Sequence, residues 1–376
     1  MVTAPARPSF FARWLPNGEA VLLGVIAVEV AFFAIAGTNF LTPRNGFEIV
    51  RLASEIGLLA FGLTAVIKTG GIDLSVGSMM ALAAVTLGAA WSAWGWPVWL
   101  AVILALMVGA AGGALNGWLV TRLRVPPLIV TLGTFSLFRG IAEATTGGYQ
   151  TYTGFPDSFL ALGQGYLAGW LPFQLVPVLA VFVALWVWLH RTVEGRELTA
   201  IGFNPEGARY AGIHVNRLTF RTYLISGVCA ALAGVIYVAR LGQAKADAGL
   251  GAELTAIAAV VLGGTAITGG RGTLHGSLLG LVALVILQNG LRLAGQPGEV
   301  AGLCTGLILI GAIAAHLRWS RAPLVSPPPS AFTMKNSQVA LIIAAILVGA
   351  LLIAGSNFFL ARSLTSGGAG VAARTA

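Results

Sequence analysis

Residues 52–93 read LASEIGLLAFGLTAVIKTGGIDLSVGSMMALAAVTLGAAWSA. Two apolar runs, 52–69 and 75–93, each approach the roughly 20 residues that an α-helix needs to cross a bilayer. The paired glycines between them end the first helix, and Asp73 and Ser75 belong to the residue types that cap the next one. The stretch therefore predicts two membrane-spanning helices separated by a polar break.

The composition of the whole chain points to the same class of fold. Hydrophobic residues make up 57% of the 376 positions and charged residues 9%, whereas a soluble domain carries about 25% charged residues. The 50 glycines fit membrane helices, in which small residues let backbones approach closely. Cys229 and Cys304 both lie in apolar runs, which is typical of buried thiols rather than of a disulfide framework. These features exclude a soluble enzyme, a DNA-binding protein and a secreted disulfide scaffold.

Further apolar runs predict an all-α fold, a polytopic transmembrane helical bundle with about 10 core helices plus one extra C-terminal helix. The core helices are expected at residues 19–37, 52–69, 75–93, 97–120, 128–145, 173–190, 218–238, 253–268, 274–291 and 297–316, and the extra helix at 337–360. The expected domains are a cytoplasmic N-terminal segment (1–18), a transmembrane domain (19–318) with a cytoplasmic loop (191–217), a Pro-rich linker (319–336), and the extra helix with its tail (337–376).

The distribution of charge predicts the orientation of the bundle. With the N-terminus in the cytoplasm, 14 of the 22 lysines and arginines fall on the cytoplasmic side, as the positive-inside rule favours. The loop 191–217 carries four arginines and three glutamates, whereas the loop 146–172 carries no lysine or arginine. The net charge of +9 is therefore interpreted as membrane topology rather than as affinity for nucleic acid.

A glycine motif occurs twice. Thr69-Gly70-Gly71, Gly77-Ser78 and Leu82 recur 199 residues later as Thr268-Gly269-Gly270, Gly276-Ser277 and Leu281, in parallel orientation, with Gly272 in the place of Asp73. Glycine-interrupted apolar segments at matching positions indicate a translocation site, since a break at membrane depth leaves helix-end N–H groups that must face a cavity. The candidate residues are Gly70, Gly71, Asp73, Ser75, Gly77, Ser78, Gly269, Gly270, Gly276 and Ser277. The alternative interpretation is a tight cytoplasmic turn before a capped helix.

The cytoplasmic loop is long enough to hold a short surface helix. Asn204 is a good cap for it, Pro205 suits its first turn, and Glu206 lies where the helix dipole favours an anion. Such a helix suggests a docking surface for a partner, and the alternative is a solvated loop.

Acidic residues in apolar runs are the remaining polar signal. Glu29, Glu55, Glu143 and Glu253 lie in or at the ends of such runs. A buried membrane acid costs about 2.5–3.5 kcal/mol on insertion scales, so it serves either proton coupling or a hydrogen bond to a backbone group or an arginine. Arg139 and Glu143 are four residues apart and are expected to be able to pair on one helix face.

The motifs of ATP hydrolysis and of common enzymes are missing from the sequence. No lysine follows a glycine, so the chain has no G-x-x-x-x-G-K-[ST] phosphate loop. The four histidines show no metal-ligand spacing, and neither G-x-S-x-G nor H-E-x-x-H occurs. We therefore expect no catalysis, cofactor or metal in this chain, and a separate motor if transport is driven by ATP.

Three features occur together and in order: TGGIDLSVGS at residues 69–78, PPLIVTLGT at 126–134, and the loop 194–217. In this combination the chain resembles the membrane permease of simple-sugar ABC importers, the family that includes ribose, arabinose, xylose, galactose, rhamnose and autoinducer-2 systems. The resemblance covers about residues 20–318. It implies a multi-pass protein of the bacterial inner membrane that moves a monosaccharide or similar polyhydroxylated solute inward. It also implies a second permease subunit, cytoplasmic ATPase subunits that use ATP and Mg, and a periplasmic solute-binding protein.

The resemblance also implies that the cytoplasmic loop contacts the ATPase. Carried over, the coupling residues are Asn204, Pro205, Glu206, Gly207, Ala208, Arg209 and Gly212. The general importer pattern is E-A-A-x-x-x-G followed by I-x-L-P. Glu206, Ala208 and Gly212 match it, whereas Gly207 replaces the middle alanine and the distal part is absent.

Two departures from this interpretation stay open at this point. A proton-coupled secondary transporter or channel for a small polar solute would use Glu29 or Glu143 to carry charge. The tail from Met334 departs from the family, and it is either an eleventh span or a signal-like segment joined to the permease.

Overall fold

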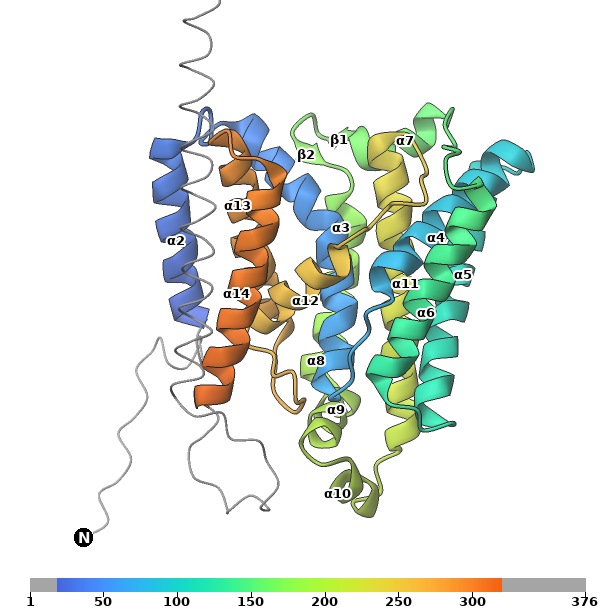
Figure 1. Ribbon diagram of the computed structural model, residues 1–376, viewed down its shortest axis with the longest axis vertical. Coiled ribbons are helices and arrows are strands. Elements are labelled where there is room, and N and C mark those ends of the chain that lie inside the picture. The colour runs from blue at the N-terminus through green and yellow to red at the C-terminus, as the bar shows by residue number, and fades with distance from the viewer. Residues whose placement is uncertain (1–18, 320–376) are drawn as a thin grey trace, which may run out of the picture. The chain divides into compact units, whose positions relative to one another are not determined.

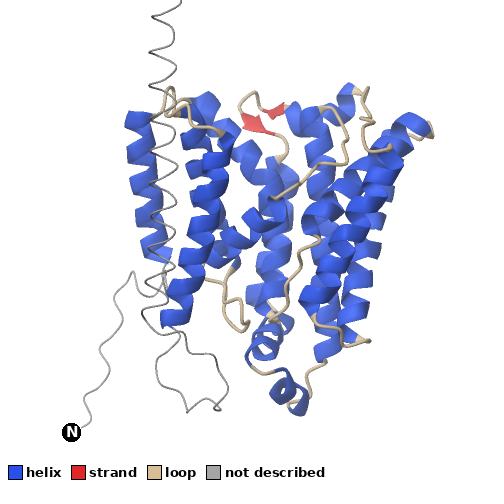
Figure 2. Ribbon diagram, viewed as in Figure 1, coloured by secondary structure: helices blue, strands red, loops and turns tan. Residues whose placement is uncertain are grey.

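The structure is a computed structural model that describes the backbone of residues 19–319 and the side chains of residues 19–311. The predicted N-terminal segment (1–18), the extra helix and tail (337–376) and all but the first residue of the linker (319–336) lie outside the described residues. Almost all of the regular secondary structure in the described part is helical, as predicted (Figure 2).

Thirteen α-helices lie in the described residues. They are α2 (Glu19–Ala36), α3 (Pro43–Lys68), α4 (Val76–Gly88), α5 (Val98–Thr121), α6 (Pro127–Thr146), α7 (Asp157–Gln164), α8 (Leu175–Arg191), α9 (Val193–Phe203), α10 (Pro205–Tyr210), α11 (Val215–Leu241), α12 (Ala252–Leu262), α13 (Leu274–Leu293) and α14 (Gly298–Trp319). A π-helical turn, η1 (Ala89–Ala93), extends α4, and a small antiparallel hairpin pairs β1 (Tyr166–Leu167) with β2 (Leu171–Pro172).

Each of the ten predicted core segments contains an apolar helix, which confirms the polytopic helical bundle. Seven helices are long and apolar enough to cross a membrane, and α8 with α9 makes an eighth if that pair, bent by 70°, is one span. The shorter apolar helices are α12 and Gly298–Gly311 of α14.

The chain alternates between two ends of the bundle (Figure 1). One end carries α9 and α10 and is called the α10 end; the other carries β1 and β2 and is called the hairpin end. The helices α2, α6, α11 and α13 run from the α10 end to the hairpin end, and α3, α5, α8 and α14 run the other way. The loops 191–217 and 146–172 therefore lie at opposite ends, as their charges predict.

Local signals set several helix ends. Thr42 caps α3 by accepting a hydrogen bond from the backbone N–H of Asn45 at 3.3 Å, and Pro43 occupies the first turn. The start predicted at residue 52 is wrong by nine residues, because polar residues in the first turns of α3 hid this cap from a hydropathy count.

The predicted helix at 253–268 is also wrong in extent. Helix α12 has 11 residues, about 16 Å, which is roughly half of a hydrocarbon core. It ends at Leu262 because Gly263 and Gly264 follow: a Cβ on Gly263 would lie 2.3 Å from the carbonyl oxygen of Gly276, and Gly264 has φ +87°. Close approach to α13, rather than the apolar pattern, fixes this end.

Helix α11 lies at the centre of the bundle and packs closely on α5 through glycines. A Cβ on Gly227 would lie 2.2 Å from the carbonyl oxygen of Gly109, and one on Gly113 would lie 2.4 Å from that of Tyr223. Such contact between small residues is the usual basis of helix association in membranes, where lipid supplies no hydrophobic drive. Part of the high glycine content is explained here.

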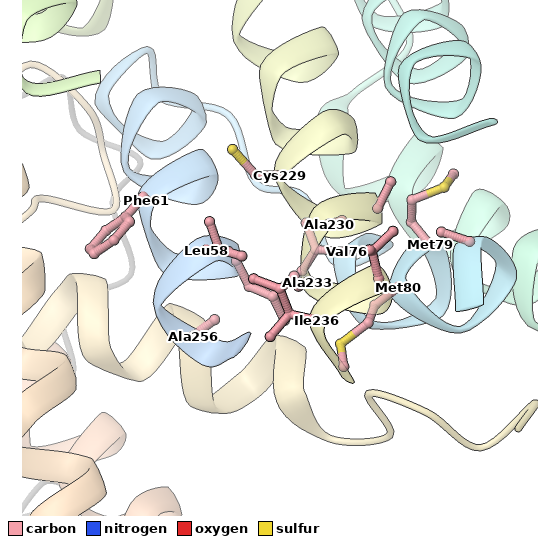
Figure 3. Packing of buried hydrophobic residues seen from close by; sticks show 14 of the residues in the cluster. Leu58, Phe61, Val76, Met79, Met80, Cys229, Ala230, Ala233, Ile236 and Ala256 are labelled. Carbon is pink, nitrogen blue, oxygen red and sulfur yellow. The ribbon is translucent and has the colours of Figure 1, made fainter. Parts of the chain in front are cut away.

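The main apolar core forms where α3, α4, α11 and α12 meet (Figure 3). Leu58 and Phe61 come from α3, Met79 and Met80 from α4, and Ile236 from α11, and each is at most 2% exposed. This core surrounds the start of α4, and so it holds the polar break in a fixed place.

Candidate translocation and coupling sites

The break before α4 reaches membrane depth. After α3 ends at Lys68, the irregular segment 69–75 rises along the bundle to the start of α4 (Figure 1). Asp73 accepts a hydrogen bond from Ser226, which lies 11 residues into α11, about 16 Å from the α10 end. Asp73 and the start of α4 therefore lie well inside the bundle, whereas the turn at Gly70 stays at its α10 end, where Gly269 contacts both Gly70 and Gly202 of α9.

Asp73 is the centre of a buried polar network. One carboxylate oxygen accepts hydrogen bonds from the backbone N–H and the hydroxyl of Ser75, at 3.0 and 2.6 Å, and the other accepts from the Ser226 hydroxyl at 2.9 Å. Asn116 of α5 donates to the Ser75 hydroxyl at 2.8 Å. Asp73 is only 1% exposed, so its carboxylate anchors the break to α5 and α11.

The expectation that Ser75 caps α4 with its side chain is wrong. Ser75 occupies the cap position but has a helical backbone conformation and makes no side-chain capping bond. A capping hydroxyl must accept from a backbone N–H, but the Ser75 oxygen accepts from the Asn116 amide instead, and its hydrogen is donated to Asp73. Ser78 in the first turn donates to the carbonyl of Ser75 at 2.9 Å.

The second glycine motif lies against the first. The backbone N–H of Gly270 donates to the carbonyl of Lys68, the last residue of α3, at 2.9 Å. A Cβ on Gly269 would lie 2.7 Å from the backbone nitrogen of Gly70, so the two glycine turns are in direct contact. The two motifs were expected to correspond in position, but their contact was not predicted.

The helices next to the two motifs are joined by a side-chain hydrogen bond. The Thr64 hydroxyl of α3 donates to that of Ser277 in α13 at 2.9 Å, and both side chains are buried. Thr273 caps α13 by accepting from the backbone N–H of Gly276 at 3.1 Å. The cap that Ser75 lacks at the first break is thus present at the second.

A second irregular segment enters the bundle from the hairpin end. Residues 242–251 follow α11 and lead to α12, whose first turn lies beside that of α4. A Cβ on Gly77 would lie 2.1 Å from a carboxylate oxygen of Glu253 and 2.6 Å from the carbonyl of Gly249. Helix α4 and the half-length helix α12 thus place their N-termini together, an arrangement that transporters use around a solute path.

Arg139 of α6 binds the irregular segment 242–251. Its guanidinium donates to the carbonyls of Ala246 and Ala248, the latter at 3.1 Å. The expected pairing of Arg139 with Glu143 is absent from the described residues, because the carbonyls of an irregular segment lack helix partners and compete for the guanidinium. Arg139 Nε and one oxygen of Glu253 have no hydrogen-bond partner in the described part of the chain, although both are buried.

A cavity of about 260 Å³ adjoins the start of α12. Its walls include Glu55 and Leu59 of α3, Met80 of α4, Tyr237 of α11, and Gly251 and Thr255 around α12. Glu55 pairs with Arg240 through two hydrogen bonds, at 2.6 and 3.2 Å. Of the two uses considered for Glu55, the bond to an arginine near a helix end is the one observed. The acid in the cavity wall is thus paired with an arginine beside the wall.

The loop 191–217 folds into two helices, α9 and α10. Asn204 caps α10 by accepting from the backbone N–H of Gly207 at 3.0 Å, and Pro205 occupies the first turn, as predicted. Glu206 pairs with Arg209 at 2.7 Å on the exposed face of α10, whereas the Ala208 side chain is buried. The exposed face of α10 projects from the α10 end of the bundle (Figure 1).

Helix α9 joins this loop to both glycine motifs. A Cβ on Gly202 would lie 2.1 Å from the backbone nitrogen of Gly270 and 2.1 Å from the carbonyl oxygen of Lys68. The Phe203 ring lies against Gly270, and the Arg271 guanidinium lies 6.0 Å from the centre of that ring. Sequence reasoning missed Gly202, since one glycine in a surface helix indicates close approach but not to which segment.

Metal binding finds no support in the described residues, where no group of three His, Cys, Asp or Glu side chains could hold an ion.

Interrupted membrane helices that meet at mid-depth, beside a partly polar cavity, define a polytopic membrane transport protein. Comparison with known families matches residues 45–313 to the permease component of the branched-chain amino acid transport system, and the chain belongs to this permease family.

Curated relatives cover most of the chain. It is 36% identical over 316 residues to the autoinducer 2 import system permease protein LsrD of Klebsiella pneumoniae, covering 81% of this chain and 95% of the relative. It is 40% identical over 287 residues to the ribose import permease protein RbsC of Bacillus subtilis, covering 76% and 88%. RbsC of Escherichia coli K12 is 38% identical over 318 residues, covering 83% and 97%. No solved structure matches the chain.

Proposed function

We propose that the chain is the permease subunit of an ABC importer that carries a monosaccharide or a similar small polyhydroxylated solute inward. The observation that carries the proposal is the 36–40% identity to ribose and autoinducer-2 import permeases over most of both chains. The interrupted helices beside a cavity give the fold a path for a small polar solute.

A sugar fits the cavity better than the amino acid in the family's description. A zwitterion brings two charges that need partners, whereas Glu55 and Arg240 in and beside the cavity wall already neutralise each other. A neutral polyol needs hydrogen-bonding groups and an apolar face, which Tyr237, Thr255 and Leu59 offer.

The motor and the delivery of solute belong to other subunits in this proposal. The sequence has no phosphate loop, so ATP and Mg are used by a cytoplasmic ATPase pair that docks on α10 through Asn204, Pro205, Glu206, Gly207, Ala208, Arg209 and Gly212. A periplasmic binding protein delivers the solute, and a second permease completes the assembly. The α10 end then faces the cytoplasm of a bacterial cell, in agreement with the positive charges of its loops.

The contacts of α9 supply a route from the motor to the membrane. Movement of α10 shifts α9, and Gly202 of α9 touches backbone atoms next to both glycine motifs. Gly202 contacts these backbone atoms directly, with no side chain between them that could move aside. Displacement of α9 therefore displaces the end of α3 and the loop before α13. Switching of the accessible side is then a movement of α12 and α13 relative to α4.

Reconstitution tests the proposal. The permease is placed in liposomes with its ATPase, and the binding protein is added on one side with radiolabelled ribose or leucine. We expect ATP-dependent uptake of the sugar and none of leucine. Matched liposomes without the ATPase are expected to show no uptake, with or without a proton gradient.

Two results would contradict the proposal. Uptake by the chain alone under a proton gradient would indicate a secondary transporter. Uptake of leucine in preference to ribose would support the transport mechanism but overturn the substrate class.

A further inference from the structure

A basic cleft of about 550 Å³ lies at the α10 end, where α5 ends and α11 begins. Its walls include Trp118 and Arg122 of α5, Arg209 of α10, and His214, Arg217 and Phe220 around the start of α11. Arg209 is one of the proposed docking residues of α10, whereas the other five belong neither to that set nor to the glycine motifs nor to the cavity beside α12. The cleft therefore needs an explanation of its own.

The charge in the cleft is largely uncompensated. Arg209 is engaged by Glu206 at 2.7 Å and by Asn216 at 3.3 Å. Neither Arg122 nor Arg217 forms an ion pair in the described part of the chain, and no acidic residue lines the cleft. The site is thus complementary to an anion.

The cleft also continues into an apolar helix face. Leu100, Ile103, Met107 and Trp118 lie along α5 at intervals of three, four and eleven residues, which places them on one face. Their exposed fractions are 44–56%. Both α5 and α11 are long enough to span the membrane, and α5 ends at the cleft where α11 begins. The cleft therefore lies at the level of the lipid headgroups, where an exposed tryptophan is also favoured.

We propose that this cleft binds the headgroup of an anionic phospholipid whose acyl chain lies along the exposed face of α5. Arg122 and Arg217 bind the phosphate, and Trp118 covers the glycerol. Basic pockets between membrane helices on the cytoplasmic side are suited to anionic headgroups. A soluble anion would not need the apolar face that leads into the pocket.

Native mass spectrometry of the full chain in detergent tests the proposal, with dioleoylphosphatidylglycerol as the anionic lipid and dioleoylphosphatidylcholine as the neutral one. We expect wild type to retain phosphatidylglycerol preferentially. Each arginine near a membrane surface contributes about 1 kcal/mol to binding anionic lipid, so R122Q/R217Q is expected to bind phosphatidylglycerol roughly 30-fold more weakly. Binding of phosphatidylcholine is expected to stay unchanged.

The control is R124Q/R196Q, which removes two arginines that do not line the cleft. Its affinity for phosphatidylglycerol is expected to fall less than about threefold, and R122K/R217K is expected to restore most of the lost preference. If the double variant does not accumulate, R122Q and R217Q are measured singly, each with an expected loss of about fivefold.

Four results would overturn the proposal. Equal retention of the two lipids would show that no anionic headgroup is recognised, and equal losses in the cleft and control variants would show a general effect of charge. Displacement of phosphatidylglycerol by millimolar inorganic phosphate would indicate an anion site without a lipid. Unchanged lipid binding together with lost co-purification of the ATPase or of a second permease would indicate a protein interface instead.

Discussion

The break before α4 and the break before α13 share the same glycine spacing but are held in different ways. At the first, Asp73 binds Ser75 and Ser226 and ties the segment to the spanning helices. At the second, Gly272 stands in its place, and backbone contacts with Lys68 and Gly202 hold the loop. The first break is thus anchored to the spanning helices and the second to α9.

This difference suggests that the two breaks have different roles. A segment fixed by a buried carboxylate resists displacement, because moving it would leave the carboxylate and its donors unpaired. A loop held by backbone contact with α9 follows that helix when it moves. We infer that the second break transmits motion and that the first provides the fixed reference.

We expect the largest effect on solute uptake from a side chain placed in the contact between α9 and the two breaks. Gly202→Val places a branched side chain where a Cβ alone would lie 2.1 Å from Gly270 N and Lys68 O. We expect solute uptake to fall at least 100-fold while the ATPase still co-purifies, since α10 is untouched. Solute uptake and co-purification of the ATPase are both measured on the reconstituted complex.

Two variants serve as controls for this experiment. Gly133→Val changes a helical glycine that has no atom within 4 Å of a Cβ, and it is expected to preserve uptake. Glu206→Lys reverses a charge on the exposed face of α10 and is expected to abolish ATPase co-purification with normal membrane insertion. Normal uptake by Gly202→Val would contradict the assigned route.

The second prediction concerns the stability that Asp73 gives to the first break. Asp73→Ala leaves the Ser75 N–H and the Ser75 and Ser226 hydroxyls without their acceptor inside the bundle. The expected loss is about 3 kcal/mol in the free energy of unfolding, because buried unsatisfied donors are costly. Unfolding in sodium dodecyl sulfate measures it. The control, Asp157→Ala, removes an exposed acid in α7 and is expected to cost far less.

The sequence predicts the segments well but not their contacts. Apolar runs identified all ten core helices, and Asn204 with Pro205 identified α10, because these signals are local. The sites depend on pairs that are distant in sequence, such as Thr64 with Ser277 and Lys68 with Gly270. Periodicity within one segment carries no information about which other segment it meets.

Depth in the membrane was equally hard to predict. The glycine pair predicted a break after α3, but only the bond from Ser226 to Asp73 shows how far the break reaches into the bundle. Likewise the run at 253–268 is apolar enough for a span, and close approach to Gly276 ends its helix at Leu262. Hydropathy records the cost of transfer to lipid and is silent on where backbone contacts interrupt a helix.

A smaller effect is expected at the second break. Thr273 accepts from the N–H of Gly276 and donates to Glu19, both at 3.1 Å. Thr273→Ala is expected to cost about 1 kcal/mol, the usual value of a helix cap, and therefore a third of the loss at Asp73. Thr145→Ala is the control, because the exposed Thr145 hydroxyl bonds only to a carbonyl of its own helix. Equal losses at Thr273 and Asp73 would remove the contrast between the breaks.

The smallest effect concerns how α9 is held at its first turn. Glu194 accepts hydrogen bonds from the Trp188 indole N–H at 2.8 Å and from the Arg221 guanidinium. The bond from Trp188, with Arg221 adding to it, holds the pKa of the Glu194 carboxyl below its ordinary value, against the effect of partial burial. A lowered pKa in the folded state stabilises the fold above the unfolded pKa, and this contribution is lost as the pH falls through the folded value.

Wild type is therefore expected to be slightly more stable than Glu194→Gln at pH 7, with the difference shrinking below about pH 4, where the unfolded carboxyl takes up its proton. The effect should be smaller than that of Thr273→Ala, because 36% of the Glu194 side chain and 43% of the Arg221 side chain remain exposed and water screens the pair. Unfolding of both proteins at several pH values measures the difference, with Glu206→Gln as the control for an exposed pair outside α9. A difference that grows toward low pH would show that Glu194 does not hold α9 as a carboxylate, and α9 would then depend on its buried side chains, such as Leu198 and Ile201, and on the contacts of Gly202.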